Sequence, residues 1–335
     1  MPLDPDVAAY LDRAAAMGLA PYEEQTPTAA REQYLRVTEA RRGPAYRPEP
    51  LRSVSDHLLH PPGRELAARA YRPFATAGSE DVGAPLVVFF HGGGWVIGDL
   101  DTHDGLARAI ARALGAIVLS VAYRLAPEHP FPAAVDDAVE ATVWAAEHAR
   151  ELGAHPTALV VAGDSAGGAL ATVVARRARD AGGPALAAQL LLYPVTDLAM
   201  TSASYREHAG GYGLTAATMA WFVTQYGAPA DTPDASPVAA AADDLAGLPP
   251  AVISTAEYDP LRDEGDAYAR ALAAAGVPTR HLRHDGLIHA YALMETIPAA
   301  RTALAADLAA LAALLGSAPE EPELRIGPET RRDWR

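Results

Sequence analysis

A G-x-S-x-G motif at residues 163–167 is the clearest chemical signal in this sequence. It follows an apolar run at 158–162 and precedes a helical pattern at 168–181. A serine in such a sharp strand-to-helix turn exposes its hydroxyl at a helix N-terminus, where free N–H groups favour developing negative charge. Ordinary glycine-rich turns also produce the short pattern. Ser165 is therefore a candidate nucleophile, and a structural turn is the alternative.

A second motif, HGGGW at residues 91–95, follows an apolar run at 86–90. Consecutive glycines expose backbone N–H groups without side chains in the way. The N–H groups of Gly93, Gly94 and Ala166 could together surround one oxygen atom. Each donor aimed at an oxyanion lowers a reaction barrier by about 3 kcal/mol. A flexible loop would explain the glycines but not their position before Ser165.

Four ordered motifs resemble the hormone-sensitive-lipase-like family of α/β-hydrolase esterases over most of residues 84–315. They are HGGGW at 91–95, YRLAPEHPFPAA at 123–134, GDSAGG at 163–168 and DPLRDEG at 259–265. The resemblance implies an α/β-hydrolase fold with a mostly parallel central sheet, helices on both faces and a helical cap. Two departures are Ala290, where relatives commonly have glycine, and a longer C-terminal tail. Neither departure removes a catalytic group.

A serine hydroxyl needs a base to take its proton, and the base needs an orienting acid. In this fold the chain order is serine, acid, histidine. Asp259 follows the apolar run at 251–255, so it is expected at the carboxyl edge of the sheet, and the match to DPLRDEG also selects it. Its competitors, Asp263 and Glu264, begin the next helix, where carboxylates ordinarily oppose the helix dipole.

Three histidines, His281, His284 and His289, follow Asp259 in the chain. His281 falls inside an expected strand and His284 at its end. His289 follows a loop, and residues 286–289 resemble the histidine-bearing loop of the family. An isolated loop histidine is more often solvated than catalytic, but position and resemblance together favour His289 as the base. Activity should then fall as the pH drops through about 6–7.

Other conspicuous residues receive structural interpretations. We expect His91 to shape the glycine loop by hydrogen bonding, and Asp164 to tune hydrogen bonds at the serine turn. His103 beside Asp104 lacks a third ligand at a sensible spacing, so it is interpreted as a helix N-terminus and no metal site is predicted. The motif at 123–134 is expected to fix a turn beneath the site. Aromatic side chains are candidate substrate contacts or lid core: Trp95, Trp221, Phe222.

Strand and helix patterns alternate along the chain after about residue 65, which predicts an α/β protein with a mostly parallel sheet. Residues 1–50 are expected to form a helical cap segment and 51–316 the catalytic domain, with a cap insertion at about 200–245 and a loosely held tail at 317–335. Expected strands are 65–71 at the sheet edge, 86–90, 116–122, 158–162, 188–193, 251–255 and 279–284. Expected helices are 105–114, 133–152, 168–181, 264–275 and 298–315.

Composition excludes several classes of protein. Half of the residues are hydrophobic and 21% are charged, so the chain can bury a core. The formal net charge of −15, with no Arg-rich stripe, disfavours nucleic-acid binding. The chain has no cysteine, which excludes disulfides and thiolate sites. No 18-residue apolar run predicts a membrane span, and the acidic start at residues 4–6 does not resemble a secretory leader, so a cytoplasmic location is expected.

Together these patterns predict a carboxylic ester hydrolase that works without metal or organic cofactor. The resemblance implies short- to medium-chain acyl esters as substrates and a possible homodimer. Two alternatives stay open. The same scaffold could serve as a non-hydrolytic small-molecule binding protein, although loss of the triad histidine is expected there. The same triad could also cleave amides, lactones or carbamates.

Overall fold

One eight-stranded sheet organises the protein in the computed structural model, which describes residues 1–43, 46–74 and 83–316. The strand order is β1-β2-β4-β3-β5-β6-β7-β8. β1 and β2 pair antiparallel, as do β2 and β4, and every other neighbouring pair is parallel. The strands are β1 (Ser53–Leu59), β2 (Leu66–Arg72), β3 (Ala84–Phe90), β4 (Ile117–Val121), β5 (Ala154–Asp164), β6 (Ala188–Leu192), β7 (Ala251–Tyr258) and β8 (Thr279–Ile288).

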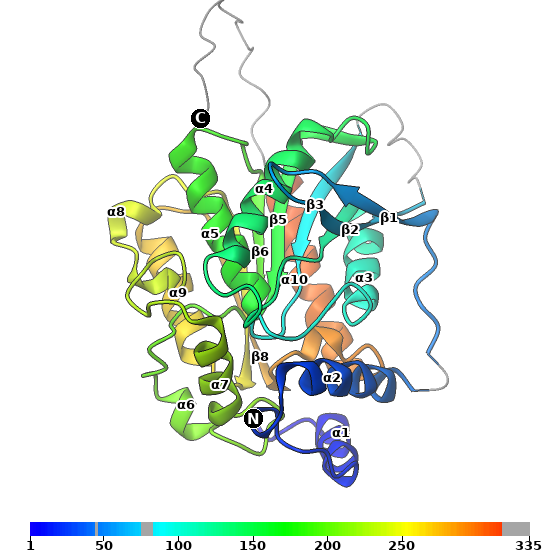
Figure 1. Cartoon of the computed structure of the whole chain (residues 1–335), viewed down its shortest axis with the longest axis vertical. Coiled ribbons are helices and arrows are strands. Elements are labelled where there is room, and N and C mark those ends of the chain that lie inside the picture. The colour runs from blue at the N-terminus through cyan, green and yellow to red at the C-terminus, as the bar shows by residue number, and fades with distance from the viewer. Residues whose placement is uncertain (44–45, 75–82, 317–335) are drawn as a thin grey trace, which may run out of the picture.

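Helices cover both faces of the sheet, as the α/β prediction requires (Figure 1). The helices α3 (Asp104–Leu114) and α10 (Pro298–Gly316) contact each other and cover one face. The other face is covered by α4 (Ala133–Glu147), α5 (Ala166–Ala181) and α9 (Arg262–Ala274). Two separate hydrophobic clusters fill the two interfaces. The central strand β3 is buried on both faces, with Leu86 to Phe90 fully inaccessible, which explains its uninterrupted apolar run.

The expected alternation of strands and helices is confirmed, but the edge of the sheet was predicted wrongly. Residues 65–71 were expected at the edge, whereas β2 pairs with both β1 and β4. The true edge strand, β1, was not predicted, because its sequence SVSDHLL is mostly polar and partly exposed. Edge strands tolerate polar side chains because one side of the strand faces solvent. The structure also ends α4 at Glu147, where the sequence predicted a helix to residue 152.

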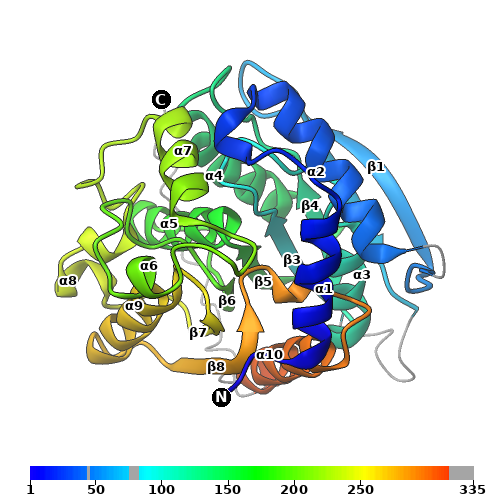
Figure 2. The same cartoon turned by 90° about the horizontal axis from the view of Figure 1, so that it is seen from below.

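Two helical segments lie at the carboxyl ends of the parallel strands (Figure 2). The N-terminal segment contains α1 (Pro5–Ala16), η1 (Tyr22–Glu24) and α2 (Pro27–Arg42). The segment between β6 and β7 contains α6 (Ser204–Glu207), α7 (Ala216–Tyr226), η2 (Pro237–Ala239) and α8 (Ala242–Leu245). Of these, α8 lies away from the carboxyl ends, beside the end of α5, where Arg179 donates to the Asp244 carbonyl oxygen (Figure 1). The two segments meet where the Thr218 hydroxyl donates a 2.8 Å hydrogen bond to Glu23. Together they cover the carboxyl ends of the strands, where the candidate catalytic residues lie.

Among the described residues, α10 is the one helix long and apolar enough to cross a membrane, with a mean hydropathy of 1.4. Its core-facing side packs on the sheet through Leu304, Leu308 and Leu311. A fully buried carboxylate, Asp307, lies on the same side and accepts a hydrogen bond from Tyr291. A core helix of a globular domain also passes such a composition test, so α10 is weak evidence for a membrane span.

Candidate active site

A strained turn joins β5 to α5 at Ser165. The serine has φ of 54° and ψ of −119°, a conformation that non-glycine residues rarely adopt. Two glycines make room for this turn. A Cβ atom on Gly163 would lie 2.2 Å from the Gly167 carbonyl oxygen, and one on Gly167 would lie 1.9 Å from the Phe90 carbonyl oxygen. The G-x-S-x-G spacing is thus explained by close backbone approach on both sides of Ser165.

Three side chains from distant parts of the chain meet at this turn. His289 Nε2 lies 3.0 Å from Ser165 Oγ, and His289 Nδ1 lies 2.7 Å from Asp259 Oδ2. The other carboxylate oxygen of Asp259 accepts a 2.8 Å hydrogen bond from the Leu261 N–H group. Asp259 is fully buried, whereas Ser165 retains 6% exposure. The arrangement lets Nδ1–H donate to the acid while Nε2 accepts from the serine hydroxyl.

The competing acids and histidines are engaged elsewhere. Asp263 accepts a hydrogen bond from the Ser204 N–H group, and Glu264 accepts one from the Thr196 N–H group. His281 pairs with Asp266, and His284 pairs with Asp307. Of the alternatives that the sequence left in contention, the structure therefore places only Asp259 and His289 next to Ser165. Asp259 stands just after β7, and His289 stands just after β8.

A buried carboxylate connects the glycine loop to the serine turn. Asp164 accepts a 2.8 Å hydrogen bond from the Gly92 N–H group, and its carboxylate lies 3.3 Å from His103 Nε2. Burial opposes ionisation of Asp164, but its contacts with His103 and Gly92 outweigh burial and lower its pKa. The sequence interpretation of His103 as a mere helix N-terminus missed this contact. His103 does occupy the N-cap of α3, but its side chain makes no capping hydrogen bond.

His91 supports the same loop from within. Its Nδ1 atom lies 2.8 Å from the Gly92 carbonyl oxygen, its ring stacks on Tyr123, and the Tyr123 hydroxyl donates to the His91 carbonyl oxygen. Burial lowers the pKa of His91 to about 4, so its ring is neutral at neutral pH. Its placement agrees with the expected shaping role and keeps a positive charge out of the loop.

The three aromatic candidates differ in their surroundings. Trp95 is only 1% exposed and stacks on Tyr226, with ring centroids 4.1 Å apart, so the structure places it in the core. Phe222 from α7 lies directly against the glycine loop, since a Cβ on Gly94 would approach its ring to 2.1 Å. Trp221 is partly buried and contacts Phe222. Phe222 therefore places its ring directly beside the expected oxyanion donor Gly94.

Helix α2 holds the outer side of the glycine loop. Arg31 donates a 2.8 Å hydrogen bond to the Val96 carbonyl oxygen and a 2.9 Å bond to the Ala126 carbonyl oxygen. The same guanidinium contacts both oxygens of Glu128, at 2.9 and 2.6 Å. Neither Arg31 nor its role was singled out from the sequence, because its partners lie far from it along the chain.

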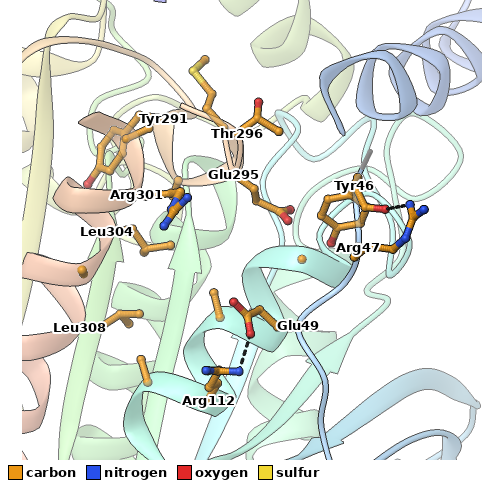
Figure 3. A pocket seen from close by; sticks show the side chains of 17 residues that line it. Tyr46, Arg47, Glu49, Arg112, Tyr291, Glu295, Thr296, Arg301, Leu304 and Leu308 are labelled. Atoms are coloured by element: carbon orange, nitrogen blue, oxygen red, sulfur yellow. Dashed lines mark hydrogen bonds and ion pairs between the residues drawn. The ribbon is translucent and has the colours of Figure 1, made fainter. Parts of the chain in front are cut away.

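A separate pocket of about 630 Å³ lies between α3, α10 and the segment that precedes β1 (Figure 3). Its lining includes Glu295, Arg301 and Leu304 but none of Ser165, Asp259 and His289. Within the described parts of the chain, no group of three or more His, Cys, Asp or Glu side chains could hold a metal ion.

The fold and the contacts around Ser165 define the class of serine hydrolases with the α/β-hydrolase fold. Comparisons with known proteins agree. The family described as "alpha/beta hydrolase fold" matches residues 87–293. The chain is 46% identical to the esterase LipI of Mycobacterium tuberculosis over 78% of this chain and 82% of that protein. It is 37% identical to an ethyl acetate hydrolase of Pseudomonas putida over 89% of this chain and 94% of that protein.

Solved structures extend the similarity to nearly the whole fold. A thermostable esterase from Pseudomonas putida has a TM-score of 0.88 at 38% identity, covering 94% of this chain and 98% of that chain. A hyperthermophilic esterase from Pyrobaculum calidifontis has a TM-score of 0.86 at 40% identity, covering 94% and 99%. The chain therefore belongs to the hormone-sensitive-lipase-like esterases of the α/β-hydrolase superfamily.

Proposed function

We propose that the protein is a serine carboxylesterase that cleaves short- to medium-chain acyl esters through an acyl-enzyme. Membership in a family of ester hydrolases supports the reaction class. The hydrogen-bonded series Ser165, His289, Asp259 is the single observation on which the proposal depends. It supplies a nucleophile, a base and an orienting acid in one place.

In the proposed reaction, Ser165 Oγ attacks the ester carbonyl carbon while His289 Nε2 takes the hydroxyl proton. Asp259 stabilises the imidazolium that forms. His289 then gives the proton to the departing alcohol, which leaves an acyl group on Ser165. A water molecule attacks this acyl-enzyme with His289 again as the base, and the carboxylic acid is released.

The N–H groups of Gly93, Gly94 and Ala166 are proposed to stabilise the oxyanion of both tetrahedral intermediates. Ala166 is the first residue of α5, and the first N–H groups of a helix have no partner within it. The hydrogen bond from Gly92 to Asp164 joins the two segments that supply the donors. Donors held in place before the reaction need little reorganisation during it, which is the source of their catalytic effect.

The preference for short acyl chains rests on the cap. Phe222 lies against Gly94 and contacts Tyr22 of the N-terminal segment, at a centroid distance of 6.5 Å. An aromatic ring beside the proposed oxyanion donors leaves restricted room for an acyl chain. The name of the Pseudomonas putida relative, an ethyl acetate hydrolase, agrees with small acyl groups.

Replacement of the proposed nucleophile tests the function directly. Ser165→Ala should lower the turnover of p-nitrophenyl butanoate by at least about 10³-fold, since removal of a triad member costs this much or more. Labelling with a fluorophosphonate, followed by peptide mapping, should modify Ser165 in the wild type only. Retained turnover in a folded Ser165→Ala variant would reject the proposal.

Matched ester and amide substrates separate the alternatives. A carboxylesterase should turn over the ester much faster than the amide, and an amidase should not. A purely binding protein would retain a small ligand without turnover of either. A cytoplasmic location and a homodimer remain predictions, which cell fractionation and light scattering of the purified chain would test.

A further inference from the structure

Arg41, near the end of α2, is a half-buried cation of the N-terminal segment. Its Nε and Nη1 atoms are inaccessible to solvent and have no hydrogen-bond partner among the described residues. Among the described residues, no carboxylate forms an ion pair with Arg41. Burying charged groups without an opposite charge costs free energy, so such a group normally persists because something compensates it.

The immediate neighbours of Arg41 do not supply a negative charge. Its guanidinium lies within hydrogen-bonding reach of the Tyr10 and Tyr34 hydroxyls and interacts through space with Tyr22. Burial raises the pKa of Tyr34 to about 12 and also raises the pKa of Tyr22, so both phenols are neutral at neutral pH. Glu295 interacts with Arg41 through space but forms no ion pair with it, and it lines the separate pocket (Figure 3).

A second unpartnered donor links Arg41 to the catalytic centre. The Tyr193 hydroxyl is buried and has no hydrogen-bond partner among the described residues, and Tyr193 interacts electrostatically with both Arg41 and Tyr34. The Tyr193 ring packs edge-on against the His289 ring, with centroids 4.9 Å apart. An unpartnered hydroxyl therefore lies beside the proposed base and within electrostatic range of Arg41. Figure 2 shows α1 and α2 crossing this end of the sheet.

We propose that Arg41 and Tyr193 form an anion-binding subsite of the catalytic centre, and that the enzyme favours esters that also carry a carboxylate. The inference rests on the proposed esterase function and names a substrate class for it. A guanidinium presents paired N–H donors whose spacing matches the two oxygens of a carboxylate, and a phenol can add a third hydrogen bond. The bound carboxylate compensates the buried charge.

The carboxylate could belong to either half of the ester, and wild-type kinetics distinguish the two. For the acyl half, monoethyl succinate is compared with the isosteric ethyl succinamate. For the alcohol half, 2-acetoxypropanoate is compared with 2-acetoxypropanamide. We expect kcat/KM to be at least tenfold higher for the anion than for its amide in one of the two pairs, because hydrogen bonds to charged groups are the stronger ones. Equal or slower turnover of the anion in both pairs would overturn the inference.

Variants assign the preference to Arg41. In Arg41→Met the ratio of kcat/KM for anion over amide should fall at least tenfold, and Arg41→Lys should retain part of it. Arg36→Met is the matched control, since Arg36 is an exposed cation on the same helix, and it should keep the wild-type ratio. An unchanged ratio in Arg41→Met would also contradict the inference. If that variant does not fold, Arg41→Lys and the wild-type comparison decide.

The two proposals fail in different ways. Turnover of none of the four esters, and no labelling of Ser165 by the fluorophosphonate, would refute the esterase function itself. Turnover of the amide-bearing esters with no preference for the anions would leave the esterase function intact and refute the subsite alone.

Discussion

Glu264 is a buried carboxyl group near the proposed catalytic acid, and the fold raises its pKa. It is 3% exposed, and burial raises its pKa well above the ordinary range, with Asp259 adding to the shift. Its Oε1 atom accepts hydrogen bonds from the N–H groups of Thr196 and Asp197, whereas Oε2 is buried without a partner. The raised pKa favours the neutral form of Glu264, and the neutral form spares Asp259 a like charge nearby.

This raised pKa predicts how Glu264 affects stability as the pH changes. Because the pKa of Glu264 is raised in the native state, the native protein binds this proton more tightly than the unfolded chain, in which the carboxyl has a pKa of about 4.3. The contribution of Glu264 to the free energy of unfolding therefore falls as the pH rises toward the native pKa. Glu264→Gln keeps the acceptor oxygen and removes the titration. We therefore expect its thermal midpoint, relative to wild type, to increase between pH 5 and pH 9.

Differential scanning calorimetry across that pH range measures the effect. Glu151→Gln, an exposed change of the same chemistry, serves as the control and should show a constant difference. A pH-independent difference for Glu264→Gln would show that Glu264 is ionised in the native state.

At the scale of elements, α2 is a structural support of the glycine loop as well as a cover for the site. Arg31 reaches the loop through Val96 and the following turn through Ala126. The hydrogen bond from Arg31 lowers the pKa of Glu128 to about 2. The carboxylate therefore stays charged at neutral pH, and its ion pair with Arg31 weakens only as the pH falls toward that value.

Loss of this support should affect the transition state more than substrate binding. Arg31→Met should lower kcat by roughly tenfold with little change in KM, because the oxyanion donors lose their fixed position. Steady-state kinetics with p-nitrophenyl butanoate provide the measurement. Glu128→Gln is the informative comparison, since it removes the ion pair and leaves both carbonyl contacts of Arg31. A rise in KM alone for Arg31→Met would point instead to a role in binding.

At the scale of the whole molecule, the net charge of −15 should oppose the compact state. Salt screens repulsion between exposed charges, with a Debye length of about 10 Å at 0.1 M. We expect the thermal midpoint at pH 8 to rise by a few degrees between 0.02 and 0.5 M NaCl. The rise should shrink near the isoelectric point of about 5.1. Thermal unfolding at the two pH values is the test, and a midpoint independent of salt at pH 8 would contradict it.

Local patterns, together with the family resemblance, were enough to predict most of the sheet and the residues Ser165, Asp259 and His289. The strand β3 and the helix α5 carry strong apolar and glycine signals, and chain order together with the motif resemblance then selects Asp259 and His289. The polar edge strand β1 has no such signal. Contacts between residues far apart in the sequence, such as that of His103 with Asp164, depend on how the elements pack. They could not be predicted because no local rule brings such distant residues together.

The serine and the histidine that approach each other in the folded protein are separated by 124 positions along the chain. A ribosome must therefore complete β7 and β8 before the proposed reaction can begin. A shorter nascent polypeptide lacks His289 and cannot carry out this reaction. During refolding from denaturant, recovered turnover would consequently report the arrival of the last two strands rather than the initial collapse.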